Sequence, residues 1–379
     1  MHTLSPLLNT VGPAQWPVTL VGAEGARMTD DAGRHYWDFY GGHAVTMIGQ
    51  GHPHWVDALS TQASTLSFMT TLAPVPVRER AAERLCSFTG MDVAWFVNSG
   101  AEANEGALKI ARKATGRSVV IAMEGGFHGR TMGALGVTWK YRDQHAPAHG
   151  STRFVPFGDL AALEAALDED VAAVITEPVQ GIAGIVSPPA GWLDAVKGRC
   201  TDNGTLLICD EVQSGVGRTG SPLVATAQGV QPDIVTLGKG LGGGFPVAAV
   251  LMSHPVASTI GPGEHGTTFG GAPLACAAVE ATLSIIASEG LLERAIALGE
   301  QLHAALRMPG VIACRGSGVW VAVVLDRPAK PVARTLLEAG FLVGTSSDPN
   351  VLRLSPPAVL PAHAISELAH ALRSTLEST

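Results

Sequence analysis

Residues 236–246 read TLGKGLGGGFP and place one lysine, Lys239, in a glycine-rich turn after the apolar run Asp233–Leu237. A second apolar run, Thr205–Cys209, ends on Asp210. Short, nearly continuous apolar runs are typical of buried strands. Pyridoxal phosphate (PLP) chemistry requires a lysine and an aspartate at neighbouring strand ends. The lysine amine bonds to the cofactor aldehyde, and the aspartate keeps the pyridine nitrogen protonated. We therefore predict a PLP site on Lys239 and Asp210.

Lys239 differs in its surroundings from the other five lysines, which lie among polar or helical-surface neighbours at positions 109, 113, 140, 197 and 330. Desolvation between an apolar strand and glycines lowers the pKa of a lysine and yields a free amine that acts as nucleophile and base. A lysine in a turn is by itself more often a solvated charge. The presence of Asp210 favours the functional interpretation.

The composition is that of a large globular chain. Its 379 residues are 46% hydrophobic and 15% charged, which is enough apolar sequence for more than one average domain. The net charge of −8 and the pI near 5.9 argue against binding to nucleic acid or to a membrane surface. Five cysteines without a C-x-x-C pair, and an N-terminus without the segments of a signal peptide, favour a cytoplasmic protein.

The middle of the chain, from about residue 93 to 253, alternates apolar runs with amphipathic stretches. Such alternation predicts an α/β domain in which helices cover both faces of a parallel sheet. Ligand sites are then expected at the carboxyl ends of the strands. The predicted strands are Val93–Val97, Ser118–Ala122, Val171–Ile175, Thr205–Cys209, Ile234–Leu237 and Val247–Leu251.

The pattern changes after about residue 275, where long alanine- and leucine-rich helices bracket short strands. We predict helices at Ala275 to about Leu306 and at Ala362–Leu376, with strands at Gly318–Leu325 and Val351–Leu354. This arrangement indicates a smaller α+β domain at residues 276–379, beside a large domain at 51–275. Residues 1–50, with a turn at 29–33, are expected to pack on the small domain.

Two glycine-containing loops each have a structural and a functional interpretation. The segment 99–101 (Ser-Gly-Ala) follows the run Val93–Val97 and opens a helix, so its free main-chain N–H groups suit a phosphate, although an ordinary N-cap serine is the more frequent meaning. Gly238–Gly243 matches the dinucleotide fingerprint G-x-G-x-x-G, which requires a following helix. Phe245, Pro246 and a strand-like run follow instead, which argues against a nucleotide-dependent oxidoreductase.

Other candidate side chains carry positive charge or imidazole. Phe127 and Arg130 place an aromatic ring and a guanidinium in one loop, suited to stacking on a flat ring and to binding a carboxylate. Arg353 lies between apolar neighbours, where a guanidinium needs an anionic partner from the protein or from a substrate. His52 and His54 resemble half of a metal site, but no matching ligand pair lies elsewhere, so we predict no metal.

Six segments in order make this chain resemble the class III (ornithine/acetylornithine-type) aminotransferases of the fold-type-I PLP enzymes over essentially its whole length. These segments are Asn98–Glu105, Phe127–Thr131, Glu177–Gly181, Asp210–Gly220, Lys239 and His265–Gly271. The resemblance implies a large domain with a mainly parallel, seven-stranded sheet between helices, and a smaller α+β terminal domain. It also implies a homodimer with shared active sites.

The resemblance further implies a role for each matching residue. Lys239 would bind the cofactor and then move the substrate proton, while Asp210 would pair with the pyridine nitrogen. Arg353 and Arg130 would bind the two carboxylates of glutamate or 2-oxoglutarate, with Glu177 supporting them. The other implied cofactor contacts are Ser99, Gly100 and Ala101 on the phosphate, Phe127 and Val212 on the ring faces, Gln213 on the phenolic oxygen, His128, Thr267, and Thr268 on the phosphate of the neighbouring subunit.

The implied amino donor is an ω-amino compound, foremost N-acetylornithine of arginine biosynthesis, with 2-oxoglutarate as acceptor. Relatives carry the triplet Gln-Gly-Glu, whereas residues 180–182 of this chain read Gln-Gly-Ile. In those relatives the glutamate, which Ile182 replaces here, pairs with the arginine that matches Arg353. Without it, Arg353 stays available for carboxylates and free ornithine becomes a less suitable donor. Ala272 and Gly106 replace an asparagine and an alanine of the family, and we have no functional account of either. Alternatives are an ornithine- or 4-aminobutyrate-type aminotransferase, a dialkylglycine-decarboxylase-like enzyme, and a non-catalytic binding protein of the same fold.

Overall fold

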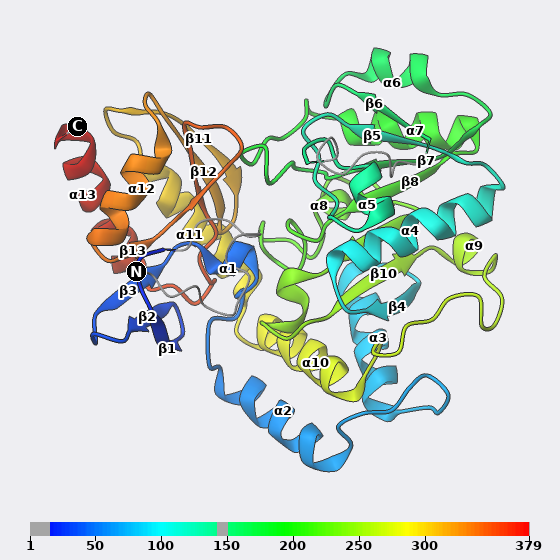
Figure 1. The fold of residues 1–379 in the computed structure, drawn as a ribbon, viewed down its shortest axis with the longest axis horizontal. Coiled ribbons are helices and arrows are strands. Elements are labelled where there is room, and N and C mark those ends of the chain that lie inside the picture. Colours follow the sequence, from blue (N-terminus) through cyan, green and yellow to red (C-terminus); the bar gives the residue numbers. More distant parts are fainter. Residues whose placement is uncertain (1–15, 142–150, 379) are drawn as a thin grey trace, which may run out of the picture.

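The computed structural model describes residues 16–141 and 151–378 (Figure 1). A large sheet with its helices forms one side of the molecule, and a smaller group of strands and helices forms the other. Residues 1–50 were predicted to pack on the small domain, and residues 1–15 of that segment lie outside the described part.

The large sheet has seven strands in the order β4-β10-β9-β8-β7-β5-β6. Its mostly parallel α/β architecture confirms the predicted fold class. Only β10 runs antiparallel to its neighbours, β4 and β9. The short link from β9 to β10, built on the 3₁₀ turn Lys239–Gly242, leaves no room for the crossover helix that a parallel pair needs. The strands are β4 (Val93–Val97), β5 (Val119–Met123), β6 (Thr152–Val155), β7 (Val171–Thr176), β8 (Leu206–Asp210), β9 (Ile234–Leu237) and β10 (Ala248–Met252). The sequence analysis did not predict β6, whose residues are only half-buried except for the last.

Helices cover both faces of this sheet, so successive strand residues pack into different layers. Val174 of β7 packs in one cluster with Val196 of α7, whereas the adjacent Ile175 packs in another with Ile110 of α4. This two-sided burial explains why the strands read as continuous apolar runs. The helices of this part are α2 (Pro53–Thr65), α3 (Pro76–Thr89), α4 (Gly100–Thr115), α5 (Met132–Gly136), α6 (Leu160–Ala166), α7 (Trp192–Asn203), α8 (Val224–Ala227), α9 (His254–Ala257) and α10 (Pro273–Ser288).

The smaller part is built on an antiparallel sheet of order β11-β12-β15-β14. Its strands are β11 (Val311–Ser317), β12 (Trp320–Leu325), β14 (Gly344–Thr345) and β15 (Val351–Leu354), and its helices are α11 (Leu291–Ala305), α12 (Ala329–Glu338) and α13 (Ala362–Ser378). The observed strand β12 begins two residues later than the predicted strand 318–325. The strand β11 was not predicted, because its residues are half-buried or exposed. Residues 318 and 319 instead form the turn between β11 and β12.

The predicted single helix from Ala275 to about Leu306 is wrong. The structure has two helices, α10 and α11, separated at Gly290, whose φ of 60° lies in the left-handed region. A left-handed residue cannot continue a right-handed helix, so the chain turns there. No single helix in the described ranges is long and apolar enough to cross a membrane; α10 and α11 pass that test of length and composition only as a pair bent by 66°.

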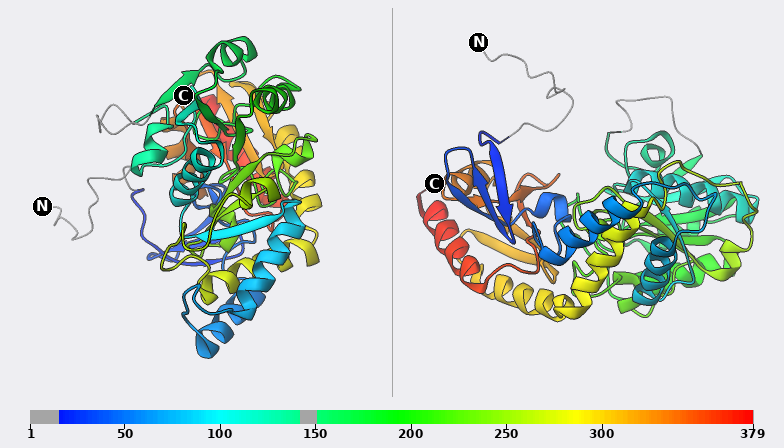
Figure 2. Two further views of the ribbon diagram at one scale, coloured as in Figure 1. Left: turned by 90° about the vertical axis from the view of Figure 1, so that its right-hand side faces the viewer. Right: turned by 90° about the horizontal axis from the view of Figure 1, so that it is seen from below.

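The segment near the N-terminus joins the C-terminal elements. The strands β1 (Leu20–Glu24), β2 (Arg27–Asp30) and β3 (His35–Asp38) form a sheet whose last member is β13 (Phe341–Leu342), parallel to β3. Figure 2 shows these strands beside the C-terminal helices, while α10 and α11 run between the two parts of the molecule.

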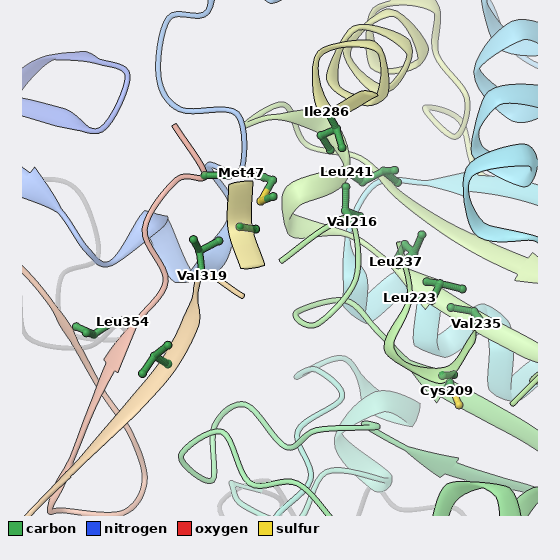
Figure 3. Packing of buried hydrophobic residues seen from close by; sticks show 14 of the residues in the cluster. Met47, Cys209, Val216, Leu223, Val235, Leu237, Leu241, Ile286, Val319 and Leu354 are labelled. Carbon is green, nitrogen blue, oxygen red and sulfur yellow. The ribbon is translucent and has the colours of Figure 1, made fainter. Parts of the chain in front are cut away.

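One hydrophobic core connects the two parts. Figure 3 shows buried side chains that follow one another from Val235 and Leu237 of the large sheet, past Met47, to Val319 and Leu354 of the small part. Because protein interiors are close-packed, this continuous core fixes the small sheet relative to the strand ends of the large one. The functional side chains at the junction are therefore held from both sides.

Candidate active site

A cavity of about 290 Å³ lies where the strand ends of the large sheet meet the small part. Residues at or after the ends of five strands, β4, β5, β7, β8 and β9, contribute to it, as expected for an α/β sheet. Its walls contain most of the predicted site residues, namely Gly100, Ala101, Phe127, His128, Arg130, Glu177, Asp210, Val212, Gln213 and Lys239. Asn104, Gly129 and Ile182, which were not predicted as site residues, line it as well.

Asp210 ends β8 and is buried. Its Oδ2 accepts hydrogen bonds from His128 Nδ1 and Asn104 Nδ2, both at 2.8 Å, and its Oδ1 accepts one from the amide of Val212 at 3.0 Å. Burial raises the pKa of Asp210, but the hydrogen bond and charge of His128 outweigh it, so the pKa lies below its usual value. The carboxylate is thus held ionised, and Oδ1 keeps a lone pair for one further donor.

Lys239 begins the 3₁₀ turn that follows β9 and has a left-handed φ of 43°. Its side chain is partly accessible from the cavity. Burial lowers the pKa of its amine, and the positive charge of Arg353 lowers it further, while Asp210 and Glu177 oppose this effect. The result is an amine that loses its proton more readily than an ordinary lysine, as a nucleophile or base requires.

The start of α4 forms another wall of the cavity. Ser99 is the N-cap residue, with its hydroxyl accepting a hydrogen bond from the amide of Glu102 at 3.2 Å. The amides of Gly100 and Ala101 have no partner within the helix, because the first turn of a helix leaves its N–H groups free. A Cβ at Gly100 would lie 2.6 Å from Val212 Cγ1, so only glycine fits beside that side chain.

Arg130 lies on the outer side of the cavity between two aromatic rings. Its guanidinium is 5.8 Å from the ring centre of Phe127 and 4.8 Å from that of Tyr141, and the two rings meet edge to face at 6.2 Å. Such cation–π contacts hold an arginine in place while its N–H groups stay available to an anion.

Arg353 extends from β15 and is buried. Its Nε donates to the carbonyl of Thr345 at 2.8 Å and its Nη1 to that of Gly181 at 3.4 Å. No carboxylate of the described residues lies within ion-pair distance of it. Ile182 lines the cavity. Arg353 is therefore a buried cation with free capacity for a carboxylate, as expected from its apolar neighbours in the sequence.

Glu177 follows β7 and supports two loops of the cavity. Its Oε1 accepts from the amide of Phe127 at 2.9 Å and its Oε2 from the amide of Gly181 at 3.0 Å. Burial raises the pKa of this carboxyl to about 6. The side chain thus connects the Phe127 loop to the loop that carries Ile182.

Three of the predicted cofactor residues, Ser99, Thr267 and Thr268, do not line the cavity of this single chain. Thr267 accepts a hydrogen bond through Oγ1 from Asn98 Nδ2 at 3.1 Å, beside the start of α4, and Thr268 is exposed. Within the described ranges, no group of three or more His, Cys, Asp or Glu side chains is arranged to hold a metal ion. Of the two histidines considered as half a metal site, His52 contacts Glu289 Oε1 through Nε2 at 2.7 Å.

Sequence reasoning gave no role to Asn104, although it lies inside one of the matching segments. Its amide nitrogen donates to Asp210 Oδ2 and to the carbonyl of His128, and its Oδ1 accepts from Thr236 Oγ1 at 2.8 Å. An asparagine on the buried face of an otherwise alanine-rich helix was the available signal.

Six non-glycine residues of the described ranges have left-handed backbone, and one of them, Lys239, lines the cavity. The described residues in this class are His43, Ala44, Tyr141, Ile185, Val216 and Lys239. Each costs conformational energy, which native structures accept mainly at functional sites. Tyr141 and His43 were not predicted as site residues, because φ is not legible from a single sequence.

Comparison with known proteins agrees with this geometry. A family model described as aminotransferase class-III matches residues 10–376. The chain belongs to the class-III aminotransferases. This class-III aminotransferase is 45% identical to the acetylornithine aminotransferase of Streptomyces coelicolor, covering 98% of this chain and 93% of the relative. It is also 45% identical to the acetylornithine aminotransferase of Methanopyrus kandleri, covering 96% of each chain.

Solved structures extend the similarity to the whole fold. An ornithine aminotransferase of Toxoplasma gondii, with PLP at partial occupancy in its active site, superposes with a TM-score of 0.92 at 33% identity, over 97% of this chain and 92% of that chain. The acetylornithine aminotransferase of Elizabethkingia anophelis gives 0.84 at 31% identity, over 96% and 95%. The prediction that this chain is a fold-type-I aminotransferase of class III is confirmed.

Proposed function

We propose that this class-III aminotransferase transfers the δ-amino group of an N-acylated ornithine, with N-acetylornithine as the first candidate, to 2-oxoglutarate. The acetylornithine aminotransferases at 45% identity support this donor. The observation that carries the proposal is that Lys239 and Asp210 line one cavity. Beside it, Arg353 is a buried guanidinium that donates to the carbonyl of Gly181 and has no carboxylate partner among the described residues.

The cofactor of this enzyme is PLP, and the residues of the cavity fit it. Asp210 offers a buried, ionised carboxylate for a protonated pyridine nitrogen, and Lys239 offers an amine of lowered pKa for the aldehyde. Gly100 and Ala101 present free helix N–H groups suited to the phosphate. Val212 and Phe127 would contact the two ring faces, and Gln213 the phenolic oxygen. When bound, PLP withdraws electrons from the substrate carbon and so makes its proton removable.

Lys239 would move that proton. Its amine, once free of the cofactor, stands in the cavity as a base of lowered pKa and then returns the proton as an acid. Asn104 and His128 contribute by fixing Asp210, because each donates to the same carboxylate oxygen. Removal of either donor would leave this buried oxygen with one hydrogen bond in place of two.

The substrate end of the cavity has two guanidiniums. Arg353 and Arg130 would bind the carboxylates of glutamate and 2-oxoglutarate, since paired N–H groups match a carboxylate. With Ile182 in place of a glutamate, no nearby carboxylate competes for Arg353. The α-ammonium of free ornithine would also lack an anionic partner there, which favours a donor whose α-nitrogen is acylated.

The working enzyme would be a homodimer whose sites need both chains. Phe68 and Phe269 lie 5.2 Å apart and are exposed, and Leu72 keeps 94% of its surface accessible. The side chain of Arg78 ties the carbonyls of Met69 and Gly271 together in this region. An apolar patch of this kind is typical of a subunit interface, and it adjoins the exposed Thr268, which would reach the phosphate in the partner's site.

A half-reaction titration tests the donor. The purified protein is loaded with PLP, and the change in cofactor absorbance is followed on separate addition of N-acetylornithine, ornithine, 4-aminobutyrate and glutamate. We expect rapid conversion with glutamate and N-acetylornithine and slow conversion with ornithine. A best reaction with ornithine or 4-aminobutyrate would refute the acylated donor, and failure of all four would refute the aminotransferase reaction.

A further inference from the structure

The segment Gly41–Ala44 is a left-handed turn beside the cavity. All four residues have positive φ, from 57° to 72°. At Gly41 only glycine fits, because a Cβ would collide with the carbonyl of Ser355. His43 and Ala44 carry side chains in this conformation, which costs roughly 1–2 kcal/mol per residue. Such a cost at a non-glycine residue near an active site calls for a functional reason.

Both strained residues are held by side chains of the Asp210 segment. Gln213, which lines the cavity, donates through Nε2 to the carbonyl of His43 at 3.2 Å. Arg218 donates through Nη2 to the carbonyl of Ala44 at 3.2 Å. These bonds fix the turn, and with it the direction of the imidazole, relative to the cofactor residues.

His43 lies beside the cavity, since its carbonyl accepts from the lining residue Gln213 and its ring is close enough to Lys239 and Arg130 to interact with their charges. This ring meets the ring of Tyr40 edge to face at 4.7 Å and remains accessible. Burial by its surroundings lowers the pKa of this imidazole to about 4, and the positive charges of Arg353, Lys239 and Arg130 lower it further. No described residue hydrogen-bonds its ring nitrogens. At neutral pH His43 therefore presents one free donor and one free acceptor without charge.

The charged groups around His43 disfavour a cationic ligand at this position. Arg353, Arg130 and Lys239 are the cations, and the neighbouring Tyr40 has its pKa raised to about 12 by burial, so it is an uncharged phenol. The buried carboxyl of Glu177 is already bonded to two main-chain amides. An ammonium group here meets repulsion, whereas an uncharged amide meets hydrogen-bonding partners.

We propose that His43 binds the acyl amide of the amino donor through its ring nitrogens and thereby makes an N-acylated donor preferred over a free diamino acid. This inference rests on the proposed function and names the residue that selects the substrate. An amide has both an N–H and a carbonyl oxygen, so it can form one hydrogen bond with either the acceptor or the donor nitrogen of a neutral imidazole.

Two substitutions distinguish the contribution of the His43 ring from that of the left-handed backbone. His43→Gly removes the ring and accepts positive φ without strain, and His43→Asn keeps one donor and one acceptor in a residue that tolerates this conformation. For wild type and both variants, kcat and KM are measured in half-reactions with N-acetylornithine, ornithine and glutamate. Cofactor absorbance and thermal midpoint show whether each variant is folded and loaded.

We expect His43→Gly to lower kcat/KM for N-acetylornithine about tenfold, mainly through KM, as the loss of about one hydrogen bond predicts. The values for glutamate should change less than about twofold, and His43→Asn should retain most of the N-acetylornithine activity. Equal losses for N-acetylornithine and glutamate, or an unchanged preference over ornithine in the glycine variant, would overturn the inference. A wild-type enzyme that ignores N-acetylornithine would refute the proposed function itself.

Discussion

Two buried carboxyls of the active site, Asp210 and Glu177, have their pKa values moved in opposite directions. Asp210 receives three hydrogen bonds, one from an imidazole, and its pKa is lowered. Glu177 receives two from main-chain amides, and burial raises its pKa to about 6. Groups that titrate differently in one site are typical of catalytic centres. Asp210 therefore provides the fixed negative charge at the position proposed for the pyridine nitrogen.

The raised pKa of Glu177 predicts a pH dependence of stability. A folded-state pKa above the unfolded value of 4.5 gives stability that is full below pH 4.5 and is lost as the pH rises through 6. Relative to Glu177→Gln, the wild-type protein without cofactor should lose about 2 kcal/mol between pH 4.5 and 7. Chemical denaturation across this range measures the difference.

Burial also raises the pKa of Glu211, to about 7. Its effect on the pH dependence of stability is the same in the wild type and in Glu177→Gln, so it cancels when the two proteins are compared. Parallel stability curves for wild type and Glu177→Gln would show that Glu177 is not the group that titrates.

At the scale of elements, one buried arginine joins the loop that follows Asp210 to the turn Gly41–Ala44. Arg218 donates to the carbonyls of Ala44 and Ser355, both at 3.2 Å, and to that of Pro356. Ser355 follows β15, the strand of Arg353. Arg218 thereby ties three segments that surround the cavity, each far from the others in sequence.

The turn Gly41–Ala44 allows a matched test of this arrangement. Gly41→Ala adds a Cβ against the carbonyl of Ser355, whereas Gly42→Ala adds one with no atom closer than 3.8 Å, and both positions have φ near 58°. Gly42→Ala should cost roughly 1–2 kcal/mol of unfolding free energy from backbone strain. Gly41→Ala should cost at least about 2 kcal/mol more, because backbone must move.

Denaturation midpoints and PLP affinities are measured for Gly41→Ala and Gly42→Ala. Similar stabilities would mean that the contact between Gly41 and Ser355 does not hold the turn.

Sequence periodicity predicted those strands that read as mostly apolar runs. The strands β4, β9 and β15 have the predicted bounds, and α4 begins at the predicted serine cap. Elements with half-exposed residues, such as β6 and β11, lack the apolar run on which the prediction depends. The break at Gly290 was missed because glycine within a long apolar helix pattern gives only a weak signal.

In the site, motif matching identified residues that act through their side-chain chemistry. It could not identify His43 or Tyr141, since their importance comes from positive φ and from contacts that no motif records, with Gln213 for His43 and with Arg130 for Tyr141. The bonding of Asn104 to Asp210 likewise depends on the packing of α4 against β8. Tertiary contacts of this kind leave no local pattern.

At the scale of the whole molecule, the proposed homodimer has a candidate interface at α2 and the loops beside it. The helix α2 has no buried residue in the single chain, and exposed Phe68, Leu72 and Phe269 lie near it or on the adjoining loops. A two-fold symmetric pair of chains would bury this face. It would also bring Thr268 of one chain toward the cavity of the other.

Replacement of Leu72 by aspartate should therefore produce monomers that retain PLP poorly. A charge at a residue that is 94% exposed costs the isolated chain little, but it costs several kcal/mol inside an interface. Ile312→Asp, at a residue 67% exposed on β11, is the matched control and should stay dimeric. Light scattering after gel filtration gives both masses. A Leu72→Asp protein with wild-type mass would contradict the interface.

The most direct test of the account is to find the residue that holds the cofactor. The PLP-loaded protein is reduced with borohydride, which makes the bond between cofactor and amine permanent, and is then digested and sequenced by mass spectrometry. We predict the modification on Lys239, with Lys239→Ala remaining unmodified and inactive although folded. Modification of another lysine, or none after PLP is supplied, would contradict the assignment of the cavity.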